Sequence, residues 1–113
     1  MYNVKYGGTL IKGDMIAVST SSCLNIGFYI GLSKSGTVHY YSLEQLKWMY
    51  NNWEEQKLNK EEQDIKLRKP PVYYVYPHPL RFMKITRDVL TEPEDLENYE
   101  KALIILKELK IRK

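Results

Sequence analysis

The segment from residue 24 to residue 41 restricts the fold more than any other part of the chain. Along its first half, apolar side chains occupy every second position: Leu24, Ile26, Phe28 and Ile30. A period of two is that of a half-buried β-strand. A polar break at 33–36 ends in a glycine, and residues 37–41 then resume with β-branched and aromatic side chains. The pattern predicts a β-hairpin, and with it an antiparallel sheet.

The residues before this hairpin predict further short strands. Turn signals at Gly7-Gly8 and Gly13-Asp14 separate strand candidates at 9–12 and 15–18. Within the hairpin, Gly27 and Gly31 leave gaps on the outer face, which suit a bulge or strong coiling. The first half therefore resembles a small barrel of the Src-homology-like kind, and we expect such a β-barrel or a curled sheet.

Two helices are predicted from their start signals. Ser42 with Gln45 three residues later matches a capping box, and the helix should run to about Gln56. A second helix should begin with a threonine cap at Thr91 and run to about Lys110. The stripe expected on the first helix consists of Leu43, Leu46, Tyr50 and Trp53.

The region between the helices combines charge and β-structure. Residues 54–69 are almost all charged, and they either extend the helix or form a solvated connector. Residues 72–76 and 80–86 have strand character and are separated by a proline-rich turn, which predicts a second hairpin. The whole chain, 1–113, is thus predicted to be a single α+β domain. The expected buried core is Ile16, Val18, Leu24, Ile26, Phe28, Ile30, Leu46, Tyr50, Leu103 and Leu106.

Composition limits the class of protein. With 113 residues, of which 43% are hydrophobic, the chain can build one core. The lone Cys23 cannot form an internal disulfide, and the first residues lack the apolar run of a signal peptide. The longest apolar run, 102–106, is too short to cross a bilayer. We expect a cytoplasmic location.

No catalytic or metal-binding motif is present. The two histidines, His39 and His78, have no metal-ligand spacing to each other or to Cys23. The glycines lack the lysine-serine sequel of a phosphate loop. We therefore expect no enzyme, metal or cofactor, and an unrecognised small enzyme is the third of three functional hypotheses.

A nucleic-acid hypothesis depends on the predicted second hairpin. Tyrosines beside basic residues on a sheet can stack bases and hold phosphates. The alternative is an edge hairpin whose tyrosines pack under a helix. The net charge of +3 is weak for binding RNA or DNA. The candidate residues are Tyr73, Tyr74, Tyr76, Arg81, Lys84 and Arg87.

A protein partner is the preferred hypothesis. The candidate anchors on the first helix are Trp48, Met49 and Trp53. Trp48 and Met49 lie to one side of the stripe and widen the apolar arc beyond what one buried face needs. The last helix has the same excess, with Ile104, Ile105 and Leu109 beside its main stripe. Either that helix is deeply buried, or its second side contacts another chain and forms a homo-oligomer.

The overall character adds one resemblance. The chain is short, rich in tyrosine and lysine, punctuated by glycine in its first half and helical at its end. In this it is similar to small accessory proteins of tailed bacteriophages. The resemblance implies binding to a host or viral macromolecule, often to inhibit it, in the host cytoplasm. We expect a non-enzymatic binding module, with a protein partner preferred over nucleic acid.

Overall fold

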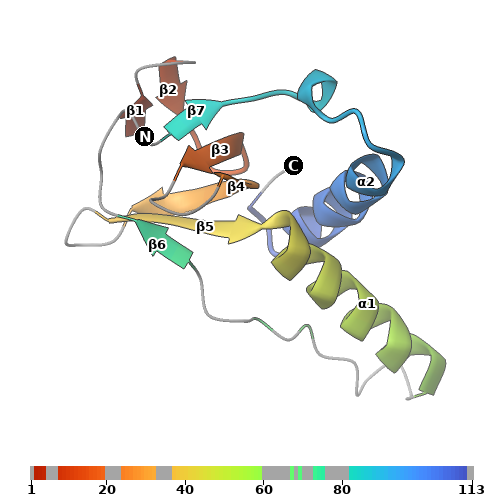
Figure 1. Cartoon of the computed structure of the whole chain (residues 1–113). Helices are drawn as coiled ribbons and strands as arrows, with labels where there is room; N and C mark the ends of the chain where they lie inside the picture. Colours follow the sequence, from red (N-terminus) through yellow and green to blue (C-terminus); the bar gives the residue numbers. More distant parts are fainter. Residues whose placement is uncertain are drawn as a thin grey trace.

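The computed structural model describes residues 2–4, 8–19, 24–32, 37–59, 67, 69, 73–75 and 82–111 (Figure 1). The elements are, in order, β1 (Tyr2–Val4), β2 (Gly8–Leu10), β3 (Met15–Ser19), β4 (Leu24–Leu32), β5 (Val38–Ser42), α1 (Leu43–Asn59), β6 (Tyr73–Val75), β7 (Phe82–Lys84), the 3-10 helix η3 (Arg87–Val89) and α2 (Pro93–Glu108). Strands and helices occupy separate parts of the molecule, so the α+β class is confirmed.

The main sheet has five strands in the order β6-β5-β4-β3-β7, with antiparallel neighbours, and β1 and β2 form a separate pair. The predicted hairpin at 24–41 is confirmed as β4 and β5, in which Phe28 lies opposite Tyr41. Over the described residues the two outer strands, β6 and β7, do not pair with each other. The described sheet is therefore open, and of the two expected forms, a small β-barrel or a curled sheet, the barrel is not observed.

The second predicted hairpin is wrong. β6 pairs with β5, where Tyr73 lies opposite Tyr40, whereas β7 pairs with β3, where Phe82 lies opposite Val18. The two strands thus lie at opposite edges of the sheet. A two-stranded hairpin is marginal by itself, and each strand gains more by extending a sheet that already exists.

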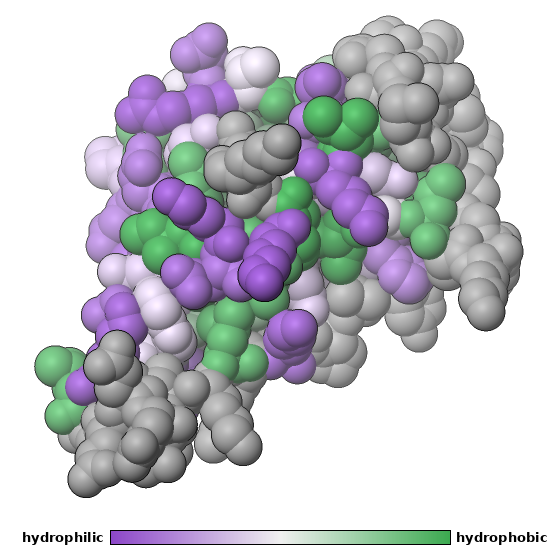
Figure 2. All heavy atoms as spheres, turned by 180° about the vertical axis from the view of Figure 1, so that it is seen from behind, coloured by the Kyte–Doolittle hydropathy of each residue, from purple (hydrophilic) through white to green (hydrophobic). Residues whose placement is uncertain are grey.

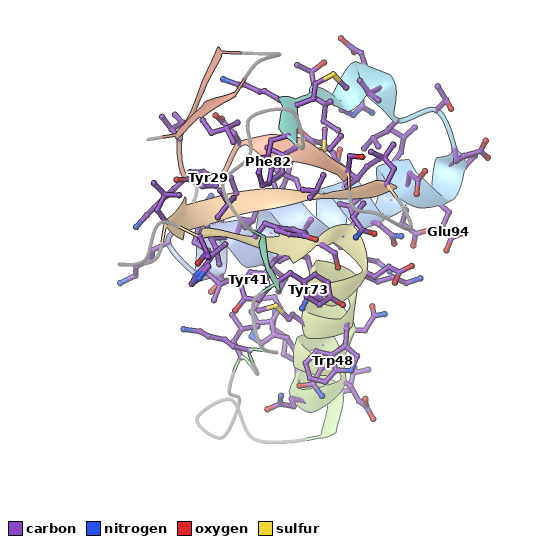
Figure 3. The ribbon with its side chains drawn as sticks, turned by 60° about the vertical axis from the view of Figure 1, so that its left-hand side comes forward. Tyr29, Tyr41, Trp48, Tyr73, Phe82 and Glu94 are labelled. Atoms are coloured by element: carbon purple, nitrogen blue, oxygen red, sulfur yellow. The ribbon has the colours of Figure 1, made fainter. Side chains whose placement is uncertain are left out.

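Apolar side chains are buried on both faces of the sheet. The helix-side core lies under α1 and α2 and includes Phe28, Leu46 and Leu106. The second core lies on the other face, as Figure 3 shows for Tyr29 and Phe82. Its members are Leu10, Ile16, Val18, Tyr29, Val38, Tyr40 and Phe82.

Burial along β4 therefore depends more on how central a residue is in the strand than on which face its side chain points to. Its central residues Phe28 and Tyr29 are both buried, although their side chains point to opposite faces. Of the predicted core, Ile16, Val18, Phe28, Leu46 and Leu106 are confirmed as buried. Half-buried positions are Ile26, Ile30, Tyr50 and Leu103. The prediction for Leu24 is wrong: it is 67% exposed, because it begins the strand at the end of the sheet.

Helix α1 begins as its sequence predicts. The Ser42 backbone N–H donates to Gln45 Oε1 at 2.9 Å, and the Gln45 N–H donates to Ser42 Oγ at 3.1 Å. This reciprocal pair is a capping box. The helix ends at Asn59, so the first residues of the predicted connector, 54–59, are helical, while most of its remainder lies outside the described residues.

Helix α2 differs from its prediction at the start. Its cap is Glu92 rather than Thr91, and Glu92 makes no side-chain capping bond. Pro93 sets this start, because its fixed φ and missing N–H suit the first helical position. At the other end, the Ile111 N–H donates to the Leu106 carbonyl at 3.0 Å, and Lys110 has a φ of 60°. These features define a Schellman motif with lysine at the position that favours glycine.

The glycines of β4 have two different roles. The pairing of β4 with β5 shifts register between Tyr29 and Gly31, and Gly31 has a φ of 140°. This irregularity agrees with the expectation of a bulge or strong coiling at this glycine. Gly27 does not leave a gap, because a Cβ there would collide with the Tyr41 carbonyl oxygen. Glycine at residue 27 allows close approach of the two strands.

The helix end supplies a stability prediction. Lys110→Gly should raise the free energy of unfolding by about 0.5–1 kcal/mol, because glycine has no Cβ penalty at positive φ. Urea unfolding followed by circular dichroism measures the change. The control Lys107→Gly, within the last helical turn, should lower the free energy of unfolding by about 1 kcal/mol. A loss of stability in Lys110→Gly would contradict the assigned helix end.

Candidate functional site

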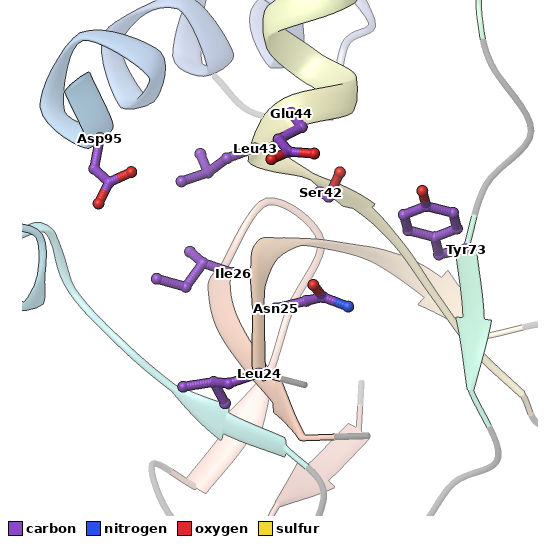
Figure 4. Close-up of a pocket in the computed structure, with 8 residues that line it drawn as sticks. All are labelled: Leu24, Asn25, Ile26, Ser42, Leu43, Glu44, Tyr73 and Asp95. Carbon is purple, nitrogen blue, oxygen red and sulfur yellow. The ribbon is translucent and has the colours of Figure 1, made fainter. Parts of the chain in front are cut away.

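Two adjoining hollows lie where α1 and α2 begin. The first has a volume of about 310 Å³ and is shown in Figure 4. It is lined by Leu24, Asn25, Ile26, Ser42, Leu43, Glu44, Tyr73 and Asp95. The second has a volume of about 510 Å³. It is lined by Leu43, Glu44, Lys47, Trp48, Asn51, Glu94, Asp95 and Asn98. Leu43, Glu44 and Asp95 belong to both, and we call the combined feature the helix-start groove.

The groove exists because two helix starts meet. Helix α1 follows β5 without a loop, so its first turn stays beside the end of the sheet. Pro93 fixes the start of α2 nearby, and Lys47 Nζ lies 3.6 Å from Glu94 Oε1 across the two helices. Figure 4 shows Leu43 and Asp95 reaching the hollow from α1 and α2, with Ile26 coming from β4. The lining of the groove thus comes from α1, α2 and the strands β4, β5 and β6.

Exposed apolar side chains flank the groove. Trp48 is 48% exposed and lies on the outer side of α1, as Figure 3 shows. Tyr73 is also 48% exposed, and its ring centre lies 5.6 Å from that of Tyr40. Leu24, which the prediction placed in the core, lines the first hollow instead. The groove therefore offers apolar contact area as well as charge.

The charge of the groove is opposite to that of the chain. Glu44, Glu94 and Asp95 line it against one ammonium, that of Lys47, while the whole chain is +3. Lys47 pairs with Glu94, whereas Glu44 and Asp95 form no ion pair with any residue in the described ranges. Carboxylates in first turns stabilise helices through the helix dipole, which offsets part of their mutual repulsion.

Asn98 is the most unusual side chain of the groove. It is only 7% exposed and lines the second hollow, on the face of α2 that also carries Ala102 and Ile105. Its carboxamide makes no hydrogen bond to the part of the chain that the structure describes. Buried polar groups are almost always hydrogen-bonded, and an unpaired one is costly. By contrast the buried Gln56 donates from Nε2 to Asn52 Oδ1 at 2.8 Å.

The three candidate anchors on α1 differ in how exposed they are. Trp48 is on the surface, but Met49 is completely buried in the helix-side core and is not available to a partner. Helical spacing explains the burial of Met49. Residues three apart lie on the same face of a helix, and Met49 is three residues after the buried Leu46. Trp53 is half-buried, and the Lys57 ammonium lies 3.4 Å from the centre of its ring. Only Trp48 remains as an exposed anchor.

The nucleic-acid candidates are not brought together. Tyr73 lies at one edge of the sheet and Lys84 at the other. Lys84 Nζ is 3.3 Å from Asp14 Oδ2, and Arg87 Nε is 3.9 Å from Glu100 Oε1. Both cations therefore have carboxylate partners. The Tyr74 side chain, Tyr76 and Arg81 lie outside what the structure describes.

Among the described residues, the other polar candidates form no metal cluster. Within the described ranges no three histidine, cysteine, aspartate or glutamate residues gather closely enough to hold a metal ion. His39 Nε2 lies 3.4 Å from Thr37 Oγ1, while Cys23 and His78 fall outside those ranges.

Burial raises the pKa of the Tyr41 phenol, so this hydroxyl is neutral at pH 7. No described helix is long and apolar enough to cross a membrane.

The second side of α2 is only partly exposed. Ile105 is fully buried, Leu109 is half-buried, and Ile104 is exposed. Figure 2 shows separate hydrophobic patches between hydrophilic side chains on the face that it presents. The widened arc of the last helix is thus explained largely by burial.

Comparison of the chain with known protein families, with curated proteins and with solved structures found no match.

Sequence reasoning missed Asn98, Glu44 and Asp95 as members of a site. Asn98 gave one signal, because it is a polar residue at helical spacing from the apolar Ala102 and Ile105. Glu44 and Asp95 gave none, since acidic residues in a first helical turn are ordinary. Their proximity follows only from the packing of α1 against α2.

The unpaired amide yields a prediction. Asn98→Leu should raise the free energy of unfolding by about 1–2 kcal/mol, because it removes a buried polar group that has no hydrogen-bond partner among the described residues. The control Gln56→Leu should lower it by about 1 kcal/mol, because a hydrogen bond is lost. Thermal and urea unfolding of both variants provide the measurement. If Asn98→Leu unfolds more easily than the original chain, the amide has a partner within the fold.

Proposed function

We propose that the protein is a non-enzymatic module that binds another protein through the helix-start groove. The observation that carries this proposal is Trp48, a tryptophan left half-exposed beside a hollow. Tryptophan has a large apolar area and dominates the energetics of many protein interfaces. The exposed Leu24 and Tyr73 extend the same apolar surface along the groove.

A protein partner is favoured over RNA or DNA by charge. Phosphates would meet the carboxylates of Glu44, Glu94 and Asp95, which repel them. The cations proposed for nucleic acid, Lys84 and Arg87, are paired with carboxylates on another part of the surface. Within the described residues, no observation favours nucleic acid.

The biological role, the kinship of the sheet and self-association are further proposals. A phage-type accessory role in the host cytoplasm, with inhibition of a host or viral protein, is compatible with a small binding module. It depends on the resemblance alone. The Src-homology-like character of the sheet is likewise a proposal, and self-association through α2 has only the exposed Ile104 in its favour.

Capture of a partner from cell lysate tests the function. The immobilised chain should retain a discrete protein after nuclease treatment. Trp48→Ala should reduce that retention about tenfold or more, because an interface tryptophan often contributes 2 kcal/mol or so. Quantitative mass spectrometry of the eluate provides the measurement.

The matched control is Leu58→Ala, which removes an 85% exposed apolar side chain from the same helix at a position that does not line the groove. It should leave retention unchanged. Equal retention by Trp48→Ala and the original chain, with both folded by circular dichroism, would refute the proposal. Loss of the captured material on nuclease treatment would favour the nucleic-acid alternative.

A further inference from the structure

We infer that the helix-start groove accepts an extended peptide segment that carries a lysine or arginine side chain next to an apolar one. This inference rests on the proposed protein-binding function and specifies the chemistry of the partner. Three independent observations on the described residues support it. The amide of Asn98 has no hydrogen-bond partner among them, the carboxylates of Glu44 and Asp95 have no ion-pair partner among them, and the ring of Trp48 is exposed.

The amide of Asn98 indicates a peptide backbone. A carboxamide presents one acceptor oxygen and an N–H donor side by side. In an extended segment the N–H and the C=O of one residue point to the same side and present the complementary donor and acceptor. Because Asn98 is 7% exposed and lines the hollow, a ligand that pairs with it must enter the groove. Such pairing would give the amide the hydrogen bonds that the described part of the chain does not provide.

The carboxylates indicate a cationic side chain. Lys47 already places an ammonium 3.6 Å from Glu94, so the groove accommodates this chemistry within the chain itself. Glu44 and Asp95, which line both hollows, have no such partner in the described part of the chain. A lysine or arginine from a bound segment would supply the missing charge, and complementary charge also speeds association.

The aromatic side chain supports the same occupant. On this helix Lys57 lies over the ring of Trp53 at 3.4 Å, a cation–π contact. Trp48 has the same indole chemistry but is exposed beside the groove carboxylates. Hollows of about 310 and 510 Å³ are of a size to take a few side chains. The occupant is thus a linear segment that inserts side chains into the groove.

A selection from a displayed library of random linear peptides, with the full chain as bait, tests the inference. Selected peptides should be enriched in lysine or arginine beside an apolar residue. A synthesised representative should bind more weakly as salt rises, because the contact is partly electrostatic. Titration calorimetry gives the Kd.

Two variants assign the contacts. Glu44→Gln combined with Asp95→Asn should weaken the peptide about tenfold and flatten its salt dependence. Asn98→Leu should weaken it about tenfold as well, while the domain remains folded. The control is Glu97→Gln combined with Glu100→Gln, which removes two carboxylates of α2 that do not line the groove. The control should bind the peptide normally.

The outcomes separate this inference from the proposed function. Selected peptides without basic residues, or affinities that the groove variants leave unchanged, overturn the peptide chemistry. If lysate capture still depends on Trp48 in that case, the protein-binding function stands. If Trp48→Ala changes neither capture nor peptide binding, both fail. A dimer in sedimentation that Trp48→Ala dissolves would identify a second copy as the occupant and overturn the peptide assignment.

Discussion

The reciprocal hydrogen bonds between Ser42 and Gln45 determine much of this structure. They cap α1 on the last residue of β5, so no loop separates strand from helix. The direction of α1 is therefore set by the sheet, and Leu46 and Met49 are turned into the helix-side core. Trp48 then necessarily lies to one side of that buried face. The exposed position of Trp48 is a consequence of this short junction, whereas the groove beside it also requires the start of α2.

Local signals were sufficient for part of the fold. The capping box and the β4–β5 hairpin depend on residues close in sequence, and both were predicted. The edge positions of β6 and β7 were not, because strand character does not say which neighbour a strand will choose. The second core was predicted only in part: Ile16 and Val18 were expected to be buried, whereas the alternation along 24–30 predicted burial of the Phe28 face and not of Tyr29. A buried tyrosine needs a partner for its hydroxyl, and sequence alone cannot supply one.

The candidate site was likewise predictable from the sequence only in part. Trp48 could be selected from the sequence, because the apolar arc of the first helix is wider than one buried face requires. The sequence could not separate it from Met49, whose burial depends on how α1 and the sheet pack. Asn98 and Asp95 join the site only because α2 starts beside α1. Contacts between helices far apart in the chain are beyond what periodicity can indicate.

The strand order also has a consequence for folding during synthesis. β3 lies between β4 and β7, and Ile16 is opposite Lys84, with α1 and three strands made in between. A ribosome-bound chain that has completed β5 and α1 thus still has an open edge on β3, whose residues 15–18 are apolar. Open apolar strand edges promote aggregation. The nascent chain is most vulnerable in the interval before β7 emerges, when the first half is made but not yet protected.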